Sequence, residues 1–209
     1  SLICFKKKNI NKKQLAEKSI YFEQKVLEEI VGVQDQIAGS YGGFNVININ
    51  KKSFIVKPLK KRKEFLKKLQ DNLLLVYSGM NRDAQKIAKT YALNLNKKFK
   101  SNISQLIEIT DEAEKILLNG TPDEFGKLLN ESWKLKKGLS NIVTNNKIDG
   151  IYDYFLNNGA LGGKILGAGG GGFLLFYMKK NKKKLISKNK DLVTIPFKFS
   201  NYGSTIISN

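Results

Sequence analysis

The chain has 209 residues, 41% of them hydrophobic and 26% charged, which is the composition of a globular protein with one or two domains. With Cys4 as its single cysteine and no histidine, it cannot form an internal disulfide, a conventional structural zinc site or a catalytic mechanism that needs imidazole. The net charge of +19 points toward anionic partners, but the lysines occur with Asn and Ile in every segment, and only Arg62 and Arg82 are arginines. We therefore favour a compositional bias over a nucleic-acid groove, in which aromatic and arginine side chains would accompany the lysines.

The sequence contains no apolar run of the roughly 18 to 20 residues that a membrane-spanning helix needs. Residues 2–5 are apolar but are followed by three lysines, the reverse of the order in a signal peptide. We therefore expect a cytoplasmic protein without a membrane partner. Because the chain begins at Ser1 rather than Met, its N-terminus is expected to be a cut end.

The N-terminal stretch predicts a helix over residues 12–29, because Asn11 and Gln14 have the pattern of a capping box and apolar residues then recur at helical spacing. Residues 31–44 contain four glycines and are interpreted as a short polar turn that carries Asp35 between two glutamines.

The remaining elements are predicted from alternation, helical periodicity and turn residues. In chain order they are a hairpin of strands at 44–49 and 54–59, a basic helix or loop at 61–70, a strand at 73–77, helices at 83–99, 102–119, 122–137 and 149–156, strands at 164–166 and 173–177, a lysine-rich helix at 180–189, and strands at 193–199 and 204–207. Thr121, Pro122 and Glu124 mark one helix start clearly. Since the helices are grouped rather than alternating with strands, we predict an α+β fold with a mostly antiparallel sheet.

The most unusual stretch is 159–173, which has eight glycines and four in succession at 169–172. Such a run allows positive φ angles and a concave set of N–H groups that can hold a phosphate. A dinucleotide fingerprint is excluded because a strand follows the glycines where a helix would be required, and a Walker A loop is excluded because no Gly-Lys-Ser or Gly-Lys-Thr follows. A tightly packed turn without a ligand is an equally weighted alternative.

Neither acidic candidate is specific when taken alone. An aspartate such as Asp35 in a glycine-rich turn usually caps a helix or forms an Asx turn, and Glu23 on an amphipathic helix usually faces solvent.

Two stretches, considered together, favour a functional role for these acidic residues and for the glycine run. Gly32-Val-Gln-Asp-Gln-Ile-Ala-Gly-Ser-Tyr-Gly-Gly43 and Gly162-Gly-Lys-Ile-Leu-Gly-Ala-Gly-Gly-Gly-Gly-Phe173 resemble two motifs of the GHMP small-molecule kinases. The pieces 73–84, 128–136 and 196–204 agree, and the match is nearest to the heptose 7-phosphate kinase branch. The resemblance covers the chain from about residue 10 onward.

The resemblance implies a role for individual residues. Asp35 matches the acidic residue beside the substrate hydroxyl, and Glu23 matches the carboxylate that helps hold Mg²⁺ on the nucleotide. The implied nucleotide-phosphate loop consists of Gly167, Ala168, Gly169, Gly170 and Gly171. The implied substrate contacts are Tyr41, Gly42, Arg82 and Lys164, of which Arg82 would meet the phosphate of the sugar.

The resemblance also implies the fold, the cofactors and the domains. The expected cofactors are ATP and Mg²⁺, and the expected reaction is phosphoryl transfer to a sugar or sugar phosphate, with D-glycero-D-manno-heptose 7-phosphate as the leading substrate. Residues 1–65 would be the remainder of the N-terminal domain, and 66–209 a ferredoxin-like C-terminal domain. The family's principal ATP loop is expected before residue 1, so the chain resembles an N-terminally truncated kinase.

Two alternatives stay open beside the kinase. One is a basic polyanion or nucleic-acid binder, which heparin retention that falls steeply with salt would favour. The other is a catalytically inactive kinase remnant. A homodimer is compatible with each of these hypotheses, and no nucleic acid is expected for the kinase.

Overall fold

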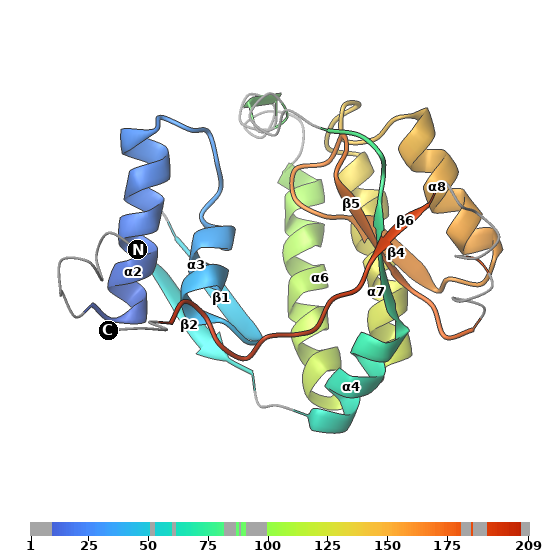
Figure 1. Cartoon of the computed structure of the whole chain (residues 1–209), viewed down its shortest axis with the longest axis horizontal. Helices are drawn as coiled ribbons and strands as arrows, with labels where there is room; N and C mark the ends of the chain where they lie inside the picture. The colour runs from blue at the N-terminus through green and yellow to red at the C-terminus, as the bar shows by residue number, and fades with distance from the viewer. Residues whose placement is uncertain are drawn as a thin grey trace. The chain divides into compact units, whose positions relative to one another are not determined.

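The structure is a computed structural model that describes residues 10–50, 53–59, 62–81, 87, 89–90, 100–180, 185 and 192–205 (Figure 1). They form two compact units, one from the residues up to Leu59 together with those from Phe199 onward, and one from Lys60–Lys198. The domain boundary at 65/66 stays a prediction. The predicted helices at 83–99 and 180–189 lie largely outside the described residues, as does the second half of the predicted strand at 204–207.

The first unit begins with helix α2, Lys12–Tyr21, which continues as the π-helical turn η1, Phe22–Val26. The predicted capping box is confirmed, because the Asn11 side chain accepts from the Gln14 N–H at 2.9 Å and the Gln14 side chain accepts from the Asn11 N–H at 3.0 Å. The helix ends before the predicted residue 29. Glu28 has a φ of 55°, which no continuing right-handed helix can contain.

Residues Gln34–Tyr41 form helix α3, so the interpretation of this stretch as a short polar turn was wrong. Ile37 is fully buried and packs with Ala16 of α2 in the small core of this unit. Tertiary burial on one face therefore outweighs the low helix propensity of the glycine and polar residues. The glycines mark the helix end, since Gly42 is the C-cap with a φ of 65°.

A two-stranded hairpin completes the elements of the first unit. Strands β1, Asn45–Ile49, and β2, Phe54–Pro58, are antiparallel, as predicted, and Ile47 pairs with Val56. Phe54 is the buried residue of the hairpin in the core with Ala16 and Ile37.

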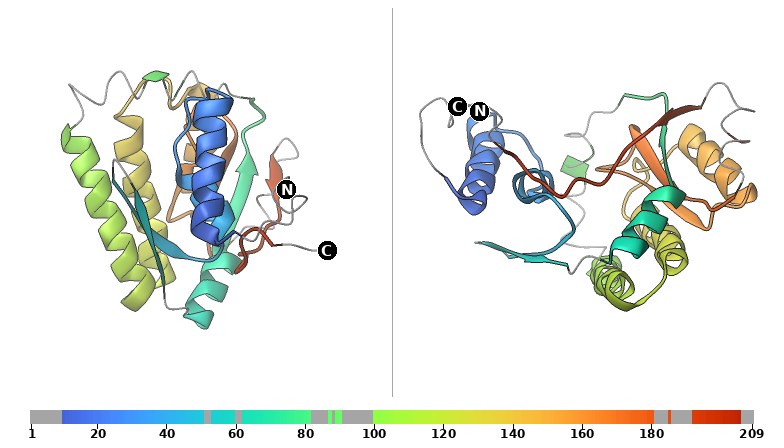
Figure 2. Two further views of the ribbon diagram at one scale, coloured as in Figure 1. Left: turned by 90° about the vertical axis from the view of Figure 1, so that its left-hand side faces the viewer. Right: turned by 60° about the horizontal axis from the view of Figure 1, so that its bottom comes forward.

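The second unit is built on a four-stranded antiparallel sheet, which confirms the predicted sheet type (Figures 1 and 2). Its strands are β3, Leu73–Tyr77, β4, Gly162–Ile165, β5, Phe173–Tyr177, and β6, Val193–Ile195. The order β4-β5-β3-β6 is that of a ferredoxin-like split β-α-β unit. Strand β6 is shorter than predicted and ends directly before Pro196, which cannot donate a ladder hydrogen bond.

Four helices of the second unit are described around this sheet. They are α4, Lys63–Asn72, α6, Lys100–Asn119, α7, Pro122–Lys137, and α8, Asn146–Asn157. The predicted start of α7 is confirmed, because Thr121 and Glu124 form a complete capping box. Helix α8 begins three residues earlier than predicted, since the Asn145 side chain accepts from the Ile148 N–H at 3.1 Å.

The sheet is covered on both faces. Gly126 of α7 lies against the ring of Tyr177 on one face, while Phe155 of α8 stacks on Phe176 of the opposite face with ring centroids 4.4 Å apart (Figure 1). Trp133, Phe155 and Phe176 are fully buried. In the described part of the chain, every helix is too short or too polar to cross a membrane.

A polar network ties the start of α7 to the sheet and makes stability depend on pH. The Asp123 carboxylate accepts from the Tyr177 hydroxyl at 2.8 Å and from the Lys179 ammonium. Partial burial opposes ionisation, but the hydrogen bonds from Lys179 and Tyr177 prevail and lower the pKa of Asp123. A lowered folded-state pKa stabilises the protein above the unfolded value of about 3.9 and loses this contribution as the pH falls through the folded value.

We expect Lys179→Met to reduce the free energy of unfolding by about 0.5 kcal/mol at pH 6, a modest amount because both side chains are partly exposed. The deficit should be smaller at pH 3, because the ion pair is progressively lost as the pH falls through the lowered folded-state pKa of Asp123. Urea titrations at the two pH values measure it, with the exposed neighbour Lys180→Met as the control. An equal deficit at both pH values would contradict the role of Asp123.

Candidate functional site

The predicted metal carboxylate, Glu23, lies in the π-helical turn η1 of the first unit. Its side chain is half-buried, and its Oε2 accepts a hydrogen bond from the Gln36 Nε2 of α3. The neighbouring Gln24 fixes the chain that follows, since its Nε2 donates to the Val31 carbonyl at 2.8 Å. The Glu23 carboxylate is therefore fixed by a hydrogen bond at a helix–helix contact. The alternative interpretation placed it on a helix face exposed to solvent.

The predicted catalytic carboxylate, Asp35, is the second residue of α3 and is exposed. Val33 at the N-cap supplies no side-chain hydrogen bond, so Asp35 is the acidic group of the first turn, where the helix dipole favours a negative charge. Fully buried Ile37, two residues on, anchors the turn that carries it. The structure thus presents an accessible carboxylate on a fixed backbone.

The predicted substrate contacts Tyr41 and Gly42 lie at the end of α3. The Tyr41 ring packs edge-on against Phe54 with centroids 6.4 Å apart. A Cβ on Gly42 would lie 2.1 Å from the backbone of Tyr202 and Gly203, so only glycine permits this crossing of two chain segments. Both residues have structural contacts, and their contact with substrate stays a prediction.

The glycine loop, Gly167–Gly172, joins β4 to β5 in the second unit and is tightly packed. The loop has positive φ angles at Gly167, Gly169, Gly170 and Gly172. A Cβ on Gly169 would lie 2.8 Å from the Val143 carbonyl oxygen. The Gly170 N–H donates to the same carbonyl at 2.7 Å, and the Gly172 N–H donates to the Met80 carbonyl at 3.0 Å.

The packed-turn interpretation therefore accounts for Gly169 and Gly170. At least two of its N–H groups already have protein acceptors, so the predicted anion nest cannot use the whole loop. Phosphate contact by Gly167, Ala168, Gly169, Gly170 and Gly171 stays a prediction.

Lys164, on β4, is a partly buried cation three residues before this loop. Its Nζ donates to the Ser132 hydroxyl of α7 at 3.2 Å, and burial lowers the pKa of its ammonium. Among the described residues, no carboxylate lies within ion-pair distance of it. A partly buried ammonium with a hydroxyl partner is a charge that an anionic ligand can balance.

A second lysine near the loop was missed by the sequence analysis. The Lys136 Nζ, at the end of α7, donates to the carbonyl of Gly167. Gln36 was missed as well, although it follows Asp35 directly. The sequence carries no signal for either contact, because each joins residues that are distant in the chain.

Two further predictions concern the metal and the phosphate of the sugar. Arg82 lies outside the described residues. In the described part of the chain, no three acidic or cysteine residues gather as a metal site. One carboxylate, Glu23, nevertheless suits Mg²⁺, which is commonly bound by one or two protein carboxylates together with substrate phosphates.

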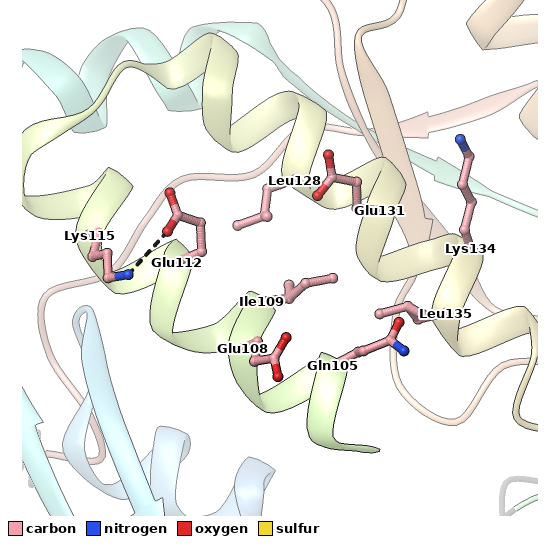
Figure 3. Close-up of a pocket in the computed structure, with 9 residues that line it drawn as sticks. All are labelled: Gln105, Glu108, Ile109, Glu112, Lys115, Leu128, Glu131, Lys134 and Leu135. Carbon is pink, nitrogen blue, oxygen red and sulfur yellow. Dashed lines mark hydrogen bonds and ion pairs between the residues drawn. The ribbon is translucent and has the colours of Figure 1, made fainter. Parts of the chain in front are cut away.

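A groove between α6 and α7, of about 540 Å³, does not coincide with any predicted site residue (Figure 3). Its floor is apolar, and three carboxylates surround it. They are Glu108, Glu112 and Glu131, and Lys115 pairs with Glu112 at 3.4 Å. Lys134 lines the groove as well, so its three carboxylates outnumber its two ammonium groups and favour a phosphate less than the region of Lys164 does.

Comparison with known proteins identifies similar chains. Residues 99–191 match the family model of the GHMP kinases C terminal domain. The chain is 31% identical over 160 residues to the D-glycero-alpha-D-manno-heptose 7-phosphate kinase of Campylobacter jejuni, a match that covers 75% of this chain and 47% of the relative. It therefore spans about half the length of that relative.

Solved structures agree on the fold. A candidate sugar kinase from Campylobacter jejuni superposes with a TM-score of 0.72 at 26% identity, covering 96% of this chain and 58% of the other. A D-glycero-D-manno-heptose 1-phosphate kinase from Bacteroides thetaiotaomicron superposes with a TM-score of 0.68 at 22% identity, covering 99% and 60%. These likenesses confirm the predicted α+β fold of the GHMP kinases.

Proposed function

From the premise that this chain carries the C-terminal domain of the GHMP kinases, we propose that it takes part in ATP- and Mg²⁺-dependent phosphoryl transfer to D-glycero-D-manno-heptose 7-phosphate. The class of reaction rests on the family, and the sugar rests on the 31% identical relative. The observation that carries the proposal is the partly buried ammonium of Lys164 next to the glycine loop, since it supplies a positive charge without a carboxylate partner among the described residues, where the family model matches.

In the proposed reaction, the acceptor hydroxyl oxygen bonds to the γ-phosphorus of ATP while the bond from that phosphorus to the β–γ bridging oxygen breaks, so that ADP leaves. The Asp35 carboxylate orients the hydroxyl and accepts its proton or polarises it. Lys164 and the glycine loop stabilise phosphate charge, and Arg82 binds the phosphate of the sugar. Glu23 helps to hold Mg²⁺, which when bound neutralises charge on the nucleotide phosphates.

The test is a transfer assay with radiolabelled ATP, Mg²⁺ and a panel of acceptors that includes heptose 7-phosphate, mannose 6-phosphate and mevalonate. We expect label on the heptose, and none after Mg²⁺ is removed with EDTA. Transfer to another acceptor would replace the substrate. A chain that binds no nucleotide but is retained on heparin with a steep salt dependence would instead be a polyanion binder.

A further inference from the structure

A side-chain contact joins the two helices that carry the proposed metal and catalytic carboxylates. The Gln36 Nε2 of α3 donates to the Glu23 Oε2 of η1, across 13 residues of sequence. Both side chains are half-buried, and α2 and α3 lie side by side (Figure 1). The contact fixes one oxygen of the Glu23 carboxylate. The orientation of that carboxylate therefore depends on a residue of α3.

This amide is kept at a cost to stability. Within the described residues, the Gln36 Oε1 is buried and has no hydrogen-bond partner. A buried acceptor without a donor destabilises a fold, and an apolar side chain of similar size would avoid this penalty. The unpaired Oε1 offsets part of the stability that the Nε2 hydrogen bond to Glu23 contributes, so stability alone is a weak explanation for a glutamine at this position.

The π-helical turn gives the contact a second, independent feature. The Leu27 N–H donates to the Phe22 carbonyl at 2.9 Å, five residues back, as a π turn requires. The wider turn rotates its residues relative to the preceding α-helix, and Glu23 lies within it facing α3.

We propose that Gln36 is a positioning residue, which orients the Glu23 carboxylate for the metal bound with the nucleotide. This inference rests on the proposed function. Gln36 acts through Glu23 and not on the substrate. Removing its amide leaves the carboxylate in place but free to rotate, so the affinity for the metal falls while the fold is retained.

The probe is Mn²⁺ in the presence of ATP, with free Mn²⁺ followed by electron paramagnetic resonance. We expect Gln36→Leu to weaken Mn²⁺ binding about tenfold, as the loss of an orienting partner of a metal ligand commonly does. The midpoint of thermal unfolding should change little, because the unpaired Oε1 is removed together with the hydrogen bond that the amide donates to Glu23. Gln34→Leu, an exposed glutamine two residues away on the same helix, should behave as the wild type.

A double-variant cycle tests whether Gln36 acts through Glu23. Glu23→Gln alone should weaken Mn²⁺ binding and raise the Mg²⁺ requirement, and adding Gln36→Leu should then change nothing further. Additive losses, or a Gln36→Leu variant with lower thermal stability and unchanged Mn²⁺ binding, overturn the inference while the proposed function stands. A wild-type chain that binds no Mn²⁺ with ATP overturns the proposed function, and this inference with it.

Discussion

Asp35→Asn is expected to lower the turnover number by about two to four orders of magnitude, the usual contribution of a positioned acid–base group. The nucleotide affinity should change much less, since the proposed role of Asp35 concerns the acceptor hydroxyl. The amide has nearly the same shape as the carboxylate, so the change removes the charge and the basicity and little else. Initial rates over a range of ATP and sugar phosphate concentrations separate the two effects.

The competing explanation for Asp35 is that it stabilises α3. A carboxylate in the first turn of a helix contributes about 0.3–1 kcal/mol through the dipole, which cannot remove more than a small fraction of the folded protein. Asp111→Asn, at an exposed aspartate of α6, is the control for loss of one negative charge. Wild-type turnover in Asp35→Asn would remove the catalytic role and leave helix stabilisation as its explanation.

Local sequence signals predicted the elements that depend on local chemistry. The caps at Asn11 and Thr121 were found because the accepting side chain and the N–H group that donates to it lie three residues apart in both. Helix α3 was missed for the opposite reason. Its stability comes from the packing of Ile37 on Ala16, which lies 21 residues away along the chain. The polar and glycine-rich sequence of the helix does not predict this contact.

The candidate site also has features that the sequence predicts and features that it does not. Asp35 and the glycine loop stand out by composition, and the resemblance supplied their proposed roles. The partners that hold the candidate residues come from other elements, as with Gln36 on Glu23 and Ser132 on Lys164. Such contacts are created by packing, so no spacing in the sequence predicts them.

The glycine loop offers the second large effect, in stability. Gly169 is buried, with a φ of 107°, and a Cβ there would lie 2.8 Å from the Val143 carbonyl oxygen and 2.9 Å from the Val143 Cγ1. Gly169→Ala therefore combines backbone strain of about 1–2 kcal/mol with overpacking of about 1–3 kcal/mol. We expect a loss of about 2–5 kcal/mol, a large share of the stability of a typical domain.

Two other glycines of the same unit separate these causes. Gly159 has a φ of 97° but open space around its Cβ position, so Gly159→Ala should show the strain alone. Gly150 lies in α8 with open space and no positive φ, so Gly150→Ala should be neutral or slightly stabilising through helix propensity. Urea unfolding followed by the fluorescence of Trp133, the only tryptophan and a fully buried one, measures all three.

The order of the three variants decides what the glycines are for. If Gly169→Ala is much less stable than Gly159→Ala, close packing against Val143 explains why a side chain is excluded at Gly169. A phosphate role must then rest on Lys164 and on loop N–H groups other than those of Gly170 and Gly172. If the two variants are equally stable, the loop yields to an added methyl group and is not held by that packing. A loss of ATP binding in Gly169→Ala, with no greater loss of stability than in Gly159→Ala, would then assign the glycine to the ligand.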